Sequence, residues 1–171
     1  MISYEWRGRF GNAAVNALHA EAFGHEVTAD DWWSQVSRHS LGWVCAWQED
    51  ELAGFVNVAW NGGGHAFLID TAVAARARHR GIGTALVSLA AGHARQAGCG
   101  WLHVDFEDHL RPFYLGSCGF RPTSAGLVPL VEPGRDVGVR VIFAPRDPSG
   151  LPADLLDGPI PDAPRELPWR G

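Results

Sequence analysis

The feature that most constrains the fold is a change of hydrophobic period in the middle of the chain. Residues 65–73 have the composition of a core strand, whereas in residues 81–97 apolar side chains recur at every third or fourth position. This spacing predicts an amphipathic helix, which is expected to end at Gly98. Residues 101–106 are nearly all apolar, as is typical of a buried parallel strand. The three segments predict a β-α-β unit with a right-handed crossover.

The shorter elements around this unit predict a mixed α/β sheet with the parallel pair at its centre. One helix is expected over residues 12–23 with Asn12 as its N-cap. A second is expected from a capping box at residues 28–31 to about Ser37, with Trp32 and Val36 facing inward. The other expected elements are a strand at 2–6, a hairpin of 42–47 and 52–60, a turn at 61–64, a short helix at 110–117, and a closing hairpin of 126–131 and 137–143.

The length and the distribution of proline predict one domain followed by a tail. The chain has 171 residues, which fits a single domain with a short appendage. Proline is concentrated after residue 130, and residues 145–171 are too rich in it for a helix or a central strand. We therefore expect a domain over residues 1–144 and an extended proline-rich tail over 145–171.

Charge and composition exclude several classes of function. The net charge is −5, so the basic surface that nucleic-acid binding requires is not expected. No apolar run approaches membrane-spanning length and no signal peptide is visible, so we expect a cytoplasmic protein without a membrane partner. The three cysteines form no ligand or disulfide pattern, so they are expected to be reduced thiols, and no metal is expected.

The segment between the strand and the helix has the composition of an anion site. Gly81 and Gly83 allow a ligand to approach the backbone closely, and the first N–H groups of the helix lack internal partners. Arg76, Arg78 and Arg80 add three cations directly before the helix. The segment lacks the Gly-Lys-Ser/Thr of a P-loop and the third glycine of a dinucleotide fingerprint. The pattern therefore predicts a pyrophosphate site of a different type.

Two motifs in this order resemble the GNAT N-acetyltransferase superfamily. Arg78-x-x-Gly81-x-Gly83 is similar to the family's Q/R-x-x-G-x-G/A loop. The segment with Pro112-Phe-Tyr114 and Cys118-Gly-Phe120 resembles its Tyr…Gly-Phe segment. With the β-α-β context, the resemblance covers roughly residues 2–131. It implies a mostly antiparallel sheet with a central parallel β-α-β unit and a splay between the two central strands.

The resemblance also implies acetyl-CoA as the acetyl donor and a primary amine as the acceptor. The coenzyme A moiety would be held by the end of the strand and by the loop. The residues implied in binding it are Ala72, Val73, Arg76, Arg78, His79, Arg80, Gly81, Ile82, Gly83 and Thr84. Two departures from the family pattern stand out. His79 occupies a position that is commonly Gly, and four residues instead of three separate Tyr114 from Gly119-Phe120.

Acyl transfer to an amine requires a base, and the leaving thiolate benefits from a proton. The resemblance makes Tyr114 the candidate acid. Asp70, His103 and Asp105 are polar insertions in apolar strands that could converge at the splay as base or acceptor contacts, and Glu107 follows them. Trp32, Trp33 and His103 are candidates to line the acceptor site. The alternative for each of these residues is a core or surface role.

We expect an N-acetyltransferase acting on the primary amine of a small molecule. Two alternatives stay open: a protein acetyltransferase acting on a lysine or an N-terminal amine, and a non-catalytic acyl-CoA-binding module. The proline-rich tail could cover an edge strand or mediate a homodimer.

Overall fold

The computed structural model describes residues 1–128, and Met1–Ser124 form one compact unit. Residues 121–128 have no regular secondary structure. The rest of the predicted closing hairpin, the domain boundary at residue 144 and the proline-rich tail therefore lie outside the described residues. Within the described part of the chain, no helix is both long and apolar enough to cross a membrane.

Five strands form one sheet in sequence order. They are β1 (Ile2–Trp6), β2 (Ser40–Gln48), β3 (Glu51–Trp60), β4 (His65–Val73) and β5 (Trp101–Val104). Neighbours from β1 to β4 pair antiparallel, and β4 pairs with β5 in parallel. The predicted mixed sheet and its parallel pair are confirmed.

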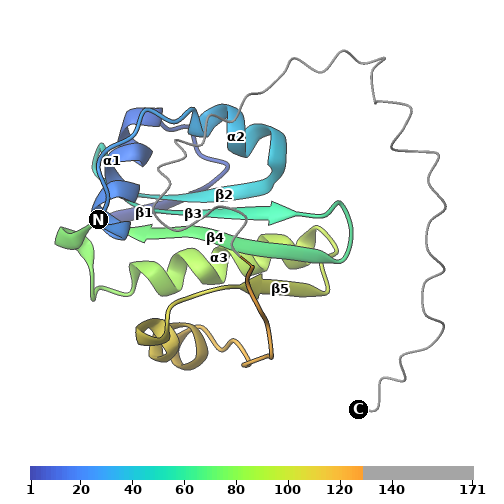
Figure 1. Cartoon of the computed structure of the whole chain (residues 1–171). Helices are drawn as coiled ribbons and strands as arrows, with labels where there is room; N and C mark the ends of the chain where they lie inside the picture. Colours follow the sequence, from blue (N-terminus) through green and yellow to red (C-terminus); the bar gives the residue numbers. More distant parts are fainter. Residues whose placement is uncertain (129–171) are drawn as a thin grey trace, which may run out of the picture. The chain divides into compact units, whose positions relative to one another are not determined.

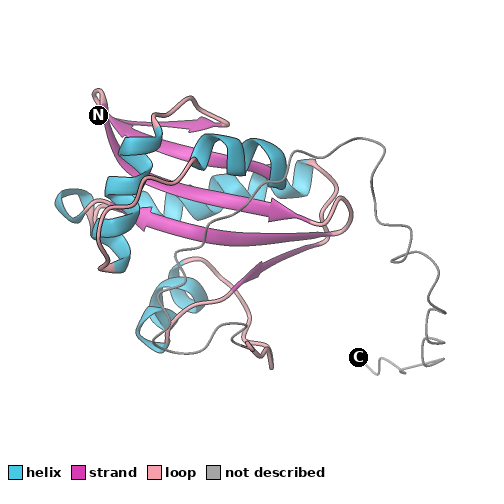
Figure 2. Ribbon diagram, turned by 45° about the horizontal axis from the view of Figure 1, so that its top comes forward, coloured by secondary structure: helices cyan, strands magenta, loops and turns pink. Residues whose placement is uncertain are grey.

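Three helices cover the sheet, with α1 (Asn12–Phe23) and α2 (Trp32–His39) on one face and α3 (Ile82–Gln96) on the other (Figures 1 and 2). The core is apolar and centres on β2, β3 and the inner face of α3. Gly54 on β3 lets α3 approach closely, because a Cβ there would lie 2.9 Å from Leu86 Cδ1. This packing fixes the N-terminal end of α3 beside the end of β4.

The caps of α1 and α2 differ from the sequence prediction. Gly11, not Asn12, is the N-cap of α1. The Asn12 side chain instead serves α2: its oxygen accepts from the Trp33 backbone N–H at 2.8 Å. Asp31 is the N-cap of α2 and accepts from Ser34 N–H at 3.2 Å. Hydrogen bonds from Ser34 and Asn12 hold the Asp31 pKa below its usual value. These bonds tie the start of α2 to α1.

Pairing between β4 and β5 stops midway along β4. The last paired residues are Leu68 and Val104, so β4 continues to Val73 without a partner on this side among the described strands. The two strands diverge beyond this point (Figure 2). This is the predicted splay. The prediction of a buried strand at residues 101–106 is wrong, because β5 ends at Val104 and is the edge strand of the described sheet, with Trp101 58% exposed.

A β-bulge interrupts β4 at Asp70. The register of β3 against β4 shifts between Phe55 and Asn57, and Asp70 has a φ of 56°. The alternation of buried Ala66 and Leu68 would place Asp70 in the core of the protein. The left-handed conformation at Asp70 breaks this alternation and leaves its carboxylate half-buried on the α1 side.

The predicted short helix at residues 110–117 is a 3₁₀ turn, Asp108–Leu110, followed by a π-helical turn, Pro112–Ser117. The Cys118 N–H donates to the Phe113 carbonyl at 2.9 Å, which is a five-residue step. Gly119 then turns the chain with a φ of 74°, and Phe120 N–H donates to the Tyr114 carbonyl at 3.0 Å. The wider turn accommodates the extra residue between Tyr114 and Gly119-Phe120.

Candidate active site

The loop before α3 presents a row of free donors. No residue of the described chain accepts a hydrogen bond from the backbone N–H groups of residues 79–84. Gly81 has a φ of 78°, a conformation that glycine adopts without steric cost. His79 also adopts a left-handed φ, 59°, which explains why glycine suits this position. Unpaired donors at a helix N-terminus form a site for an anion.

The three arginines of this loop have different partners. Arg76 forms an ion pair with Glu51 at 2.9 Å and donates to the Leu52 carbonyl at 3.4 Å, so its charge is already paired. Arg78 Nε donates to the Val73 carbonyl, and Arg80 donates to Gln48. Neither of these two has a carboxylate partner within residues 1–128. Their positive charges are therefore free to meet phosphate.

Gly83 lies in the first turn of α3, where space is tight. A Cβ at this position would lie 3.1 Å from Phe113 Cζ and 3.7 Å from Val73 Cγ2. The absence of a side chain thus lets the π-helical turn pack against the loop. The end of β4, the start of α3 and the segment carrying Tyr114 are brought together at this point.

Tyr114 is buried, 6% exposed, among aromatic rings. It stacks on Phe106 with ring centroids 4.8 Å apart and meets Phe113 edge-on at 4.7 Å. Burial raises the pKa of its phenol, and interaction with the Thr71 side chain opposes this shift. The contact falls short of a full hydrogen bond, because Thr71 Oγ1 is buried without a hydrogen-bond partner in the described structure. The phenol therefore keeps its proton beside the splayed edge of β4.

Cys118 lies near the same point, a placement that the sequence did not predict. Burial raises the pKa of its thiol, and interaction with the Thr84 side chain lowers it. At high pH, where the Cys118 thiolate forms, its negative charge adds to the raised pKa of Tyr114. The raised pKa means that the Cys118 thiol stays protonated at neutral pH, so it is a poor nucleophile.

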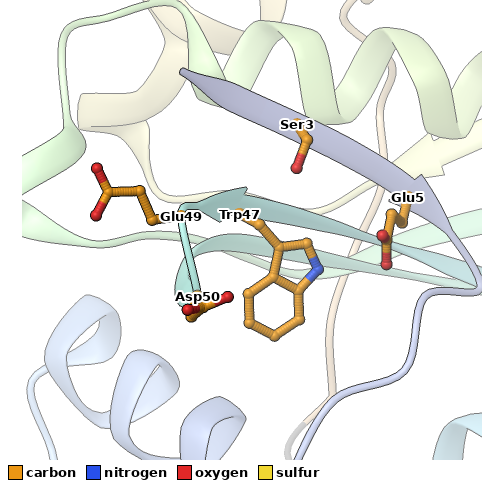
Figure 3. Close-up of a pocket in the computed structure, with 5 residues that line it drawn as sticks. All are labelled: Ser3, Glu5, Trp47, Glu49 and Asp50. Carbon is orange, nitrogen blue, oxygen red and sulfur yellow. The ribbon is translucent and has the colours of Figure 1, made fainter.

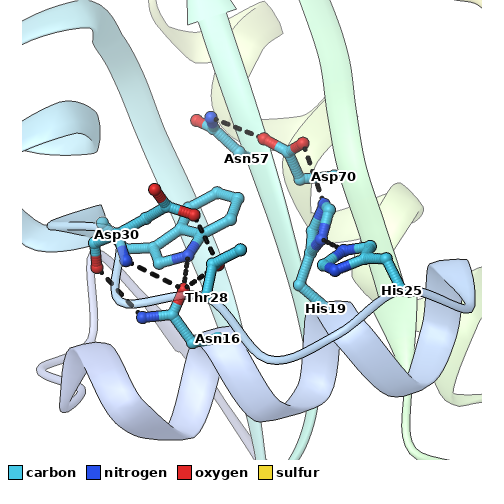
Figure 4. Close-up of polar contacts among 8 residues, drawn as sticks. Asn16, His19, His25, Thr28, Asp30, Asn57 and Asp70 are labelled. Carbon is cyan, nitrogen blue, oxygen red and sulfur yellow. Dashed lines mark hydrogen bonds and ion pairs between the residues drawn. The ribbon is translucent and has the colours of Figure 1, made fainter. Parts of the chain in front are cut away.

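Asp70 holds its carboxylate between two elements. The buried Asn57 of β3 donates to Asp70 Oδ2 at 3.2 Å, and accepts from Ser40 Oγ at 2.6 Å. His19 of α1 approaches with Nε2 3.6 Å from Asp70 Oδ1, and each side chain is 22% exposed (Figure 4). His19 in turn contacts His25. The sequence did not reveal these partners, because they come from α1 and β3, far from the motif.

Known proteins share both the sequence pattern and the fold of this chain. The model described as "Acetyltransferase (GNAT) family" matches residues 5–120. The chain belongs to the GNAT acetyltransferase family. It is therefore an acyltransferase, and enzymes of this family use acetyl-CoA. No curated protein sequence matches the chain.

Solved structures of acetyltransferases share the fold. A GNAT family acetyltransferase from Streptococcus pneumoniae TIGR4 is 20% identical with a TM-score of 0.62, over 77% of this chain and 100% of that chain. Glucosamine-6-phosphate N-acetyltransferase from Arabidopsis thaliana is 16% identical with a TM-score of 0.60, over 76% and 99%. AAC(6')-Iy, bound to the bisubstrate analogue CoA-S-monomethyl-acetylneamine, is 17% identical with a TM-score of 0.61, over 77% and 99%. At these identities the likeness concerns the fold.

Three other predicted polar residues of this GNAT protein make no contact with Asp70 among the contacts of the described residues. His103 bonds His65 at 2.7 Å and stacks on Phe67, so the predicted convergence with Asp70 does not form. Asp105 is exposed just beyond β5, and Glu107 is exposed and paired with His109 at 3.2 Å. The histidine that meets Asp70 is His19, on the neighbouring helix.

The two predicted acceptor-site tryptophans differ in burial. Trp32 is buried, and its indole N–H donates to Asn16 Oδ1 at 2.9 Å. Its ring lies 5.1 Å from that of His19, so it forms a wall beside the Asp70 group. Trp33 is partly exposed and packs edge-on against Phe10 and Trp43, and no ring contact joins it to His19 among the described residues. Trp32 is the better placed of the two.

A pocket also lies at the β1–β2 edge, lined by Ser3, Glu5, Trp47, Glu49 and Asp50 (Figure 3). None of the predicted catalytic or cofactor residues lines it. Across residues 1–128, no cluster of three metal-ligating side chains is present.

Proposed function

We propose that this protein transfers the acetyl group of acetyl-CoA to a primary amine of a small molecule. The observation that carries the proposal is the arrangement at two successive residues of β4. Asp70 holds a carboxylate on the α1 side of the splay, and Thr71 meets the buried phenol of Tyr114. A base and an acid thus flank one point of the strand.

The residues present fit acetyl-CoA. Six unpaired N–H groups and the charges of Arg78 and Arg80 suit a pyrophosphate, and the unpaired edge of β4 suits the amide-bearing pantetheine arm. Ala72 contributes to this edge, while the Val73 carbonyl is already engaged by Arg78. Ile82 is buried and Arg76 is paired with Glu51, so we assign these two to the support of the loop.

The chain's own groups have defined roles in the proposed reaction. Bound acetyl-CoA supplies an activated acetyl thioester. Asp70 takes a proton from the acceptor ammonium, which makes the nitrogen a nucleophile. Tyr114, protonated because it is buried, donates a proton to the departing sulfur. Trp32 and Phe23 pack against the ring of His19, which contacts Asp70.

A small-molecule acceptor is favoured by the acetyltransferases of similar fold, which include an enzyme named for glucosamine-6-phosphate and one bound to an acetylneamine analogue. The test is a panel of monoamines, polyamines, amino sugars and amino acids, with lysine peptides alongside. Thiol release is followed together with the mass of the product. Acetylation of a small amine that is lost in Asp70→Asn supports the proposal. Acetylation of peptides alone overturns it in favour of a protein acetyltransferase.

A further inference from the structure

Two imidazoles connect Asp70 to the protein surface. His19 Nε2 lies 3.6 Å from Asp70 Oδ1, and His19 Nδ1 lies 2.7 Å from His25 Nε2 (Figure 4). His25 Nδ1 lies 2.7 Å from the Glu26 carbonyl oxygen. His19 is half-buried, whereas His25 is exposed. The chain of contacts therefore leads from the bulge of β4 to solvent.

The Glu26 carbonyl fixes the direction of the protons along this chain. A carbonyl oxygen only accepts, so His25 must carry its proton on Nδ1. In the neutral ring, His25 Nε2 is then an acceptor, and His19 must donate to it from Nδ1. Neutral His19 therefore presents the lone pair of Nε2 to Asp70. This nitrogen is a proton acceptor aimed at the carboxylate.

We propose that His19 and His25 relay to solvent the proton that Asp70 removes from the acceptor ammonium; this inference rests on the proposed function. The N–H bond of the ammonium breaks and the proton binds Asp70. The proton then passes from Asp70 Oδ1 to His19 Nε2, while the proton on His19 Nδ1 passes to His25 Nε2. His25, now an imidazolium, releases its Nδ1 proton to water, which leaves both rings protonated on Nε2 and Asp70 again a carboxylate. Each ring then loses its Nε2 proton to water and binds one from water at Nδ1, which restores the starting tautomers before the next turnover.

The contacts of His19 offer the proton a single polar route. Phe23 stacks on His19 with ring centroids 4.3 Å apart, and Trp32 lies 5.1 Å away. Among the described residues, the titratable groups that contact His19 are Asp70 of β4 and His25 of the connection after α1. Asn57 occupies Asp70 Oδ2, so Oδ1 is left for His19. The 3.6 Å gap must shorten for transfer, as catalytic contacts do when substrate binds.

The tautomers of the two rings test the relay without any substrate. Protein labelled with ¹⁵N in histidine is examined by nitrogen–proton correlation spectroscopy at about pH 8.5, where imidazole is neutral. The relay predicts that His19 and His25 both carry the proton on Nδ1. A proton on Nε2 of either ring overturns it, because the direction of transfer is then blocked.

The kinetic test uses two substitutions of the exposed His25. Both His25→Ala and His25→Asn are expected to lower kcat about tenfold in dilute buffer, with an unchanged KM for acetyl-CoA. Asn retains a hydrogen-bonding amide but cannot carry a proton, so a merely structural role predicts that it restores the rate. Added imidazole is expected to rescue His25→Ala. His93→Ala on α3, whose ring stacks on Trp6, is the control and keeps the wild-type rate and no imidazole response.

The relay is overturned if both His25 variants keep the wild-type kcat, or if His25→Asn keeps it while His25→Ala does not. The proposed function stands in either case. If the wild-type protein acetylates no amine in the panel, the proposed function fails instead. The tautomer spectra then still decide whether the proton path exists, since they need neither donor nor acceptor.

Discussion

Removal of the Tyr114 hydroxyl tests the acid of the proposed reaction. The Tyr114→Phe variant keeps the ring that packs on Phe106 and Phe113, so the fold is retained. Its hydroxyl makes only a weak contact with Thr71, so the free energy of unfolding is expected to change by less than about 1 kcal/mol. A change in rate then reports on chemistry.

The size of the rate effect follows from the two pKa values involved. General acid catalysis is typically worth about 10²–10⁴-fold. A thiol has a pKa of about 8.5, so its thiolate leaves readily and needs little assistance. The pKa of Tyr114 is raised by burial, which makes the phenol a weak acid. We therefore expect a loss near the low end, about 10- to 100-fold in kcat, or about 1.4–2.7 kcal/mol in the barrier.

The assay is initial thiol release at saturating acetyl-CoA and amine, with CoA affinity measured by calorimetry. The matched control is Tyr4→Phe on β1, because the chain has 2 tyrosines. Tyr4→Phe is expected to keep wild-type kcat, and both variants are expected to keep wild-type CoA affinity. Unchanged kcat in Tyr114→Phe refutes the reasoning and removes the phenol from the mechanism.

The raised pKa of Tyr114 also makes the free energy of unfolding depend on pH. The folded protein holds the phenolic proton more tightly than the unfolded chain does. Its contribution is full below about pH 10, the ordinary pKa of tyrosine, and is lost as the pH rises through the folded pKa. Asp70→Asn is expected to lower kcat at least about 100-fold at pH 7, with a smaller deficit at higher pH where the amine is already neutral; a deficit independent of pH contradicts a base. Arg78→Ala combined with Gly83→Val weakens acetyl-CoA binding at least about tenfold in calorimetry, and retained affinity shows that the loop does not hold the pyrophosphate. His79→Gly relieves a left-handed residue and is expected to stabilise by about 0.5–1 kcal/mol in urea unfolding; destabilisation argues against strain there. Asn16→Ala removes the buried acceptor of the Trp32 indole and is expected to lower the free energy of unfolding by about 2–4 kcal/mol. A loss under about 1 kcal/mol contradicts the importance of the hydrogen bonds that Asn16 makes to Trp32 and Asp30 (Figure 4).

The strand, loop and helix that form the proposed pyrophosphate site were predictable because their signals are local. A strand, two glycines, three arginines and an amphipathic helix are adjacent in sequence, and each has one structural meaning. The structure adds what adjacency does not show. Arg76 is committed to Glu51, and the left-handed φ of His79 fills a position that suits glycine. Both facts depend on the β2–β3 hairpin and on backbone angles.

The surroundings of Asp70 were not predictable in the same way. Polar insertions at Asp70 and His103 suggested that they would meet on adjacent strands. The bulge turns Asp70 toward α1, where it meets His19, while His103 lies three pairs earlier and bonds His65. A bulge has no clear sequence signal, and His19 lies 51 positions before its partner, so tertiary packing decides the pair.

The irregular spacing of Tyr114 from Gly119-Phe120 is explained by local structure and not by tertiary packing. An extra residue in an α-helix rotates side chains by about 100°. The π-helical turn absorbs the residue instead, with a five-residue bond from Cys118 N–H to the Phe113 carbonyl. Tyr114 is thereby buried against the strand end. The irregular spacing is a local change of helix type.

Thermal unfolding with acetyl-CoA tests the central claim most directly, because a ligand that binds the native state raises the midpoint by mass action. At about 100 times its Kd the ligand stabilises by about 2.7 kcal/mol, a rise of about 5–10 °C for a domain of this size. We predict this rise with acetyl-CoA and with CoA but not with NADH, and its loss in the Arg78→Ala/Gly83→Val double variant. An unchanged midpoint at millimolar acetyl-CoA contradicts the assignment of the loop and of the reaction that depends on it.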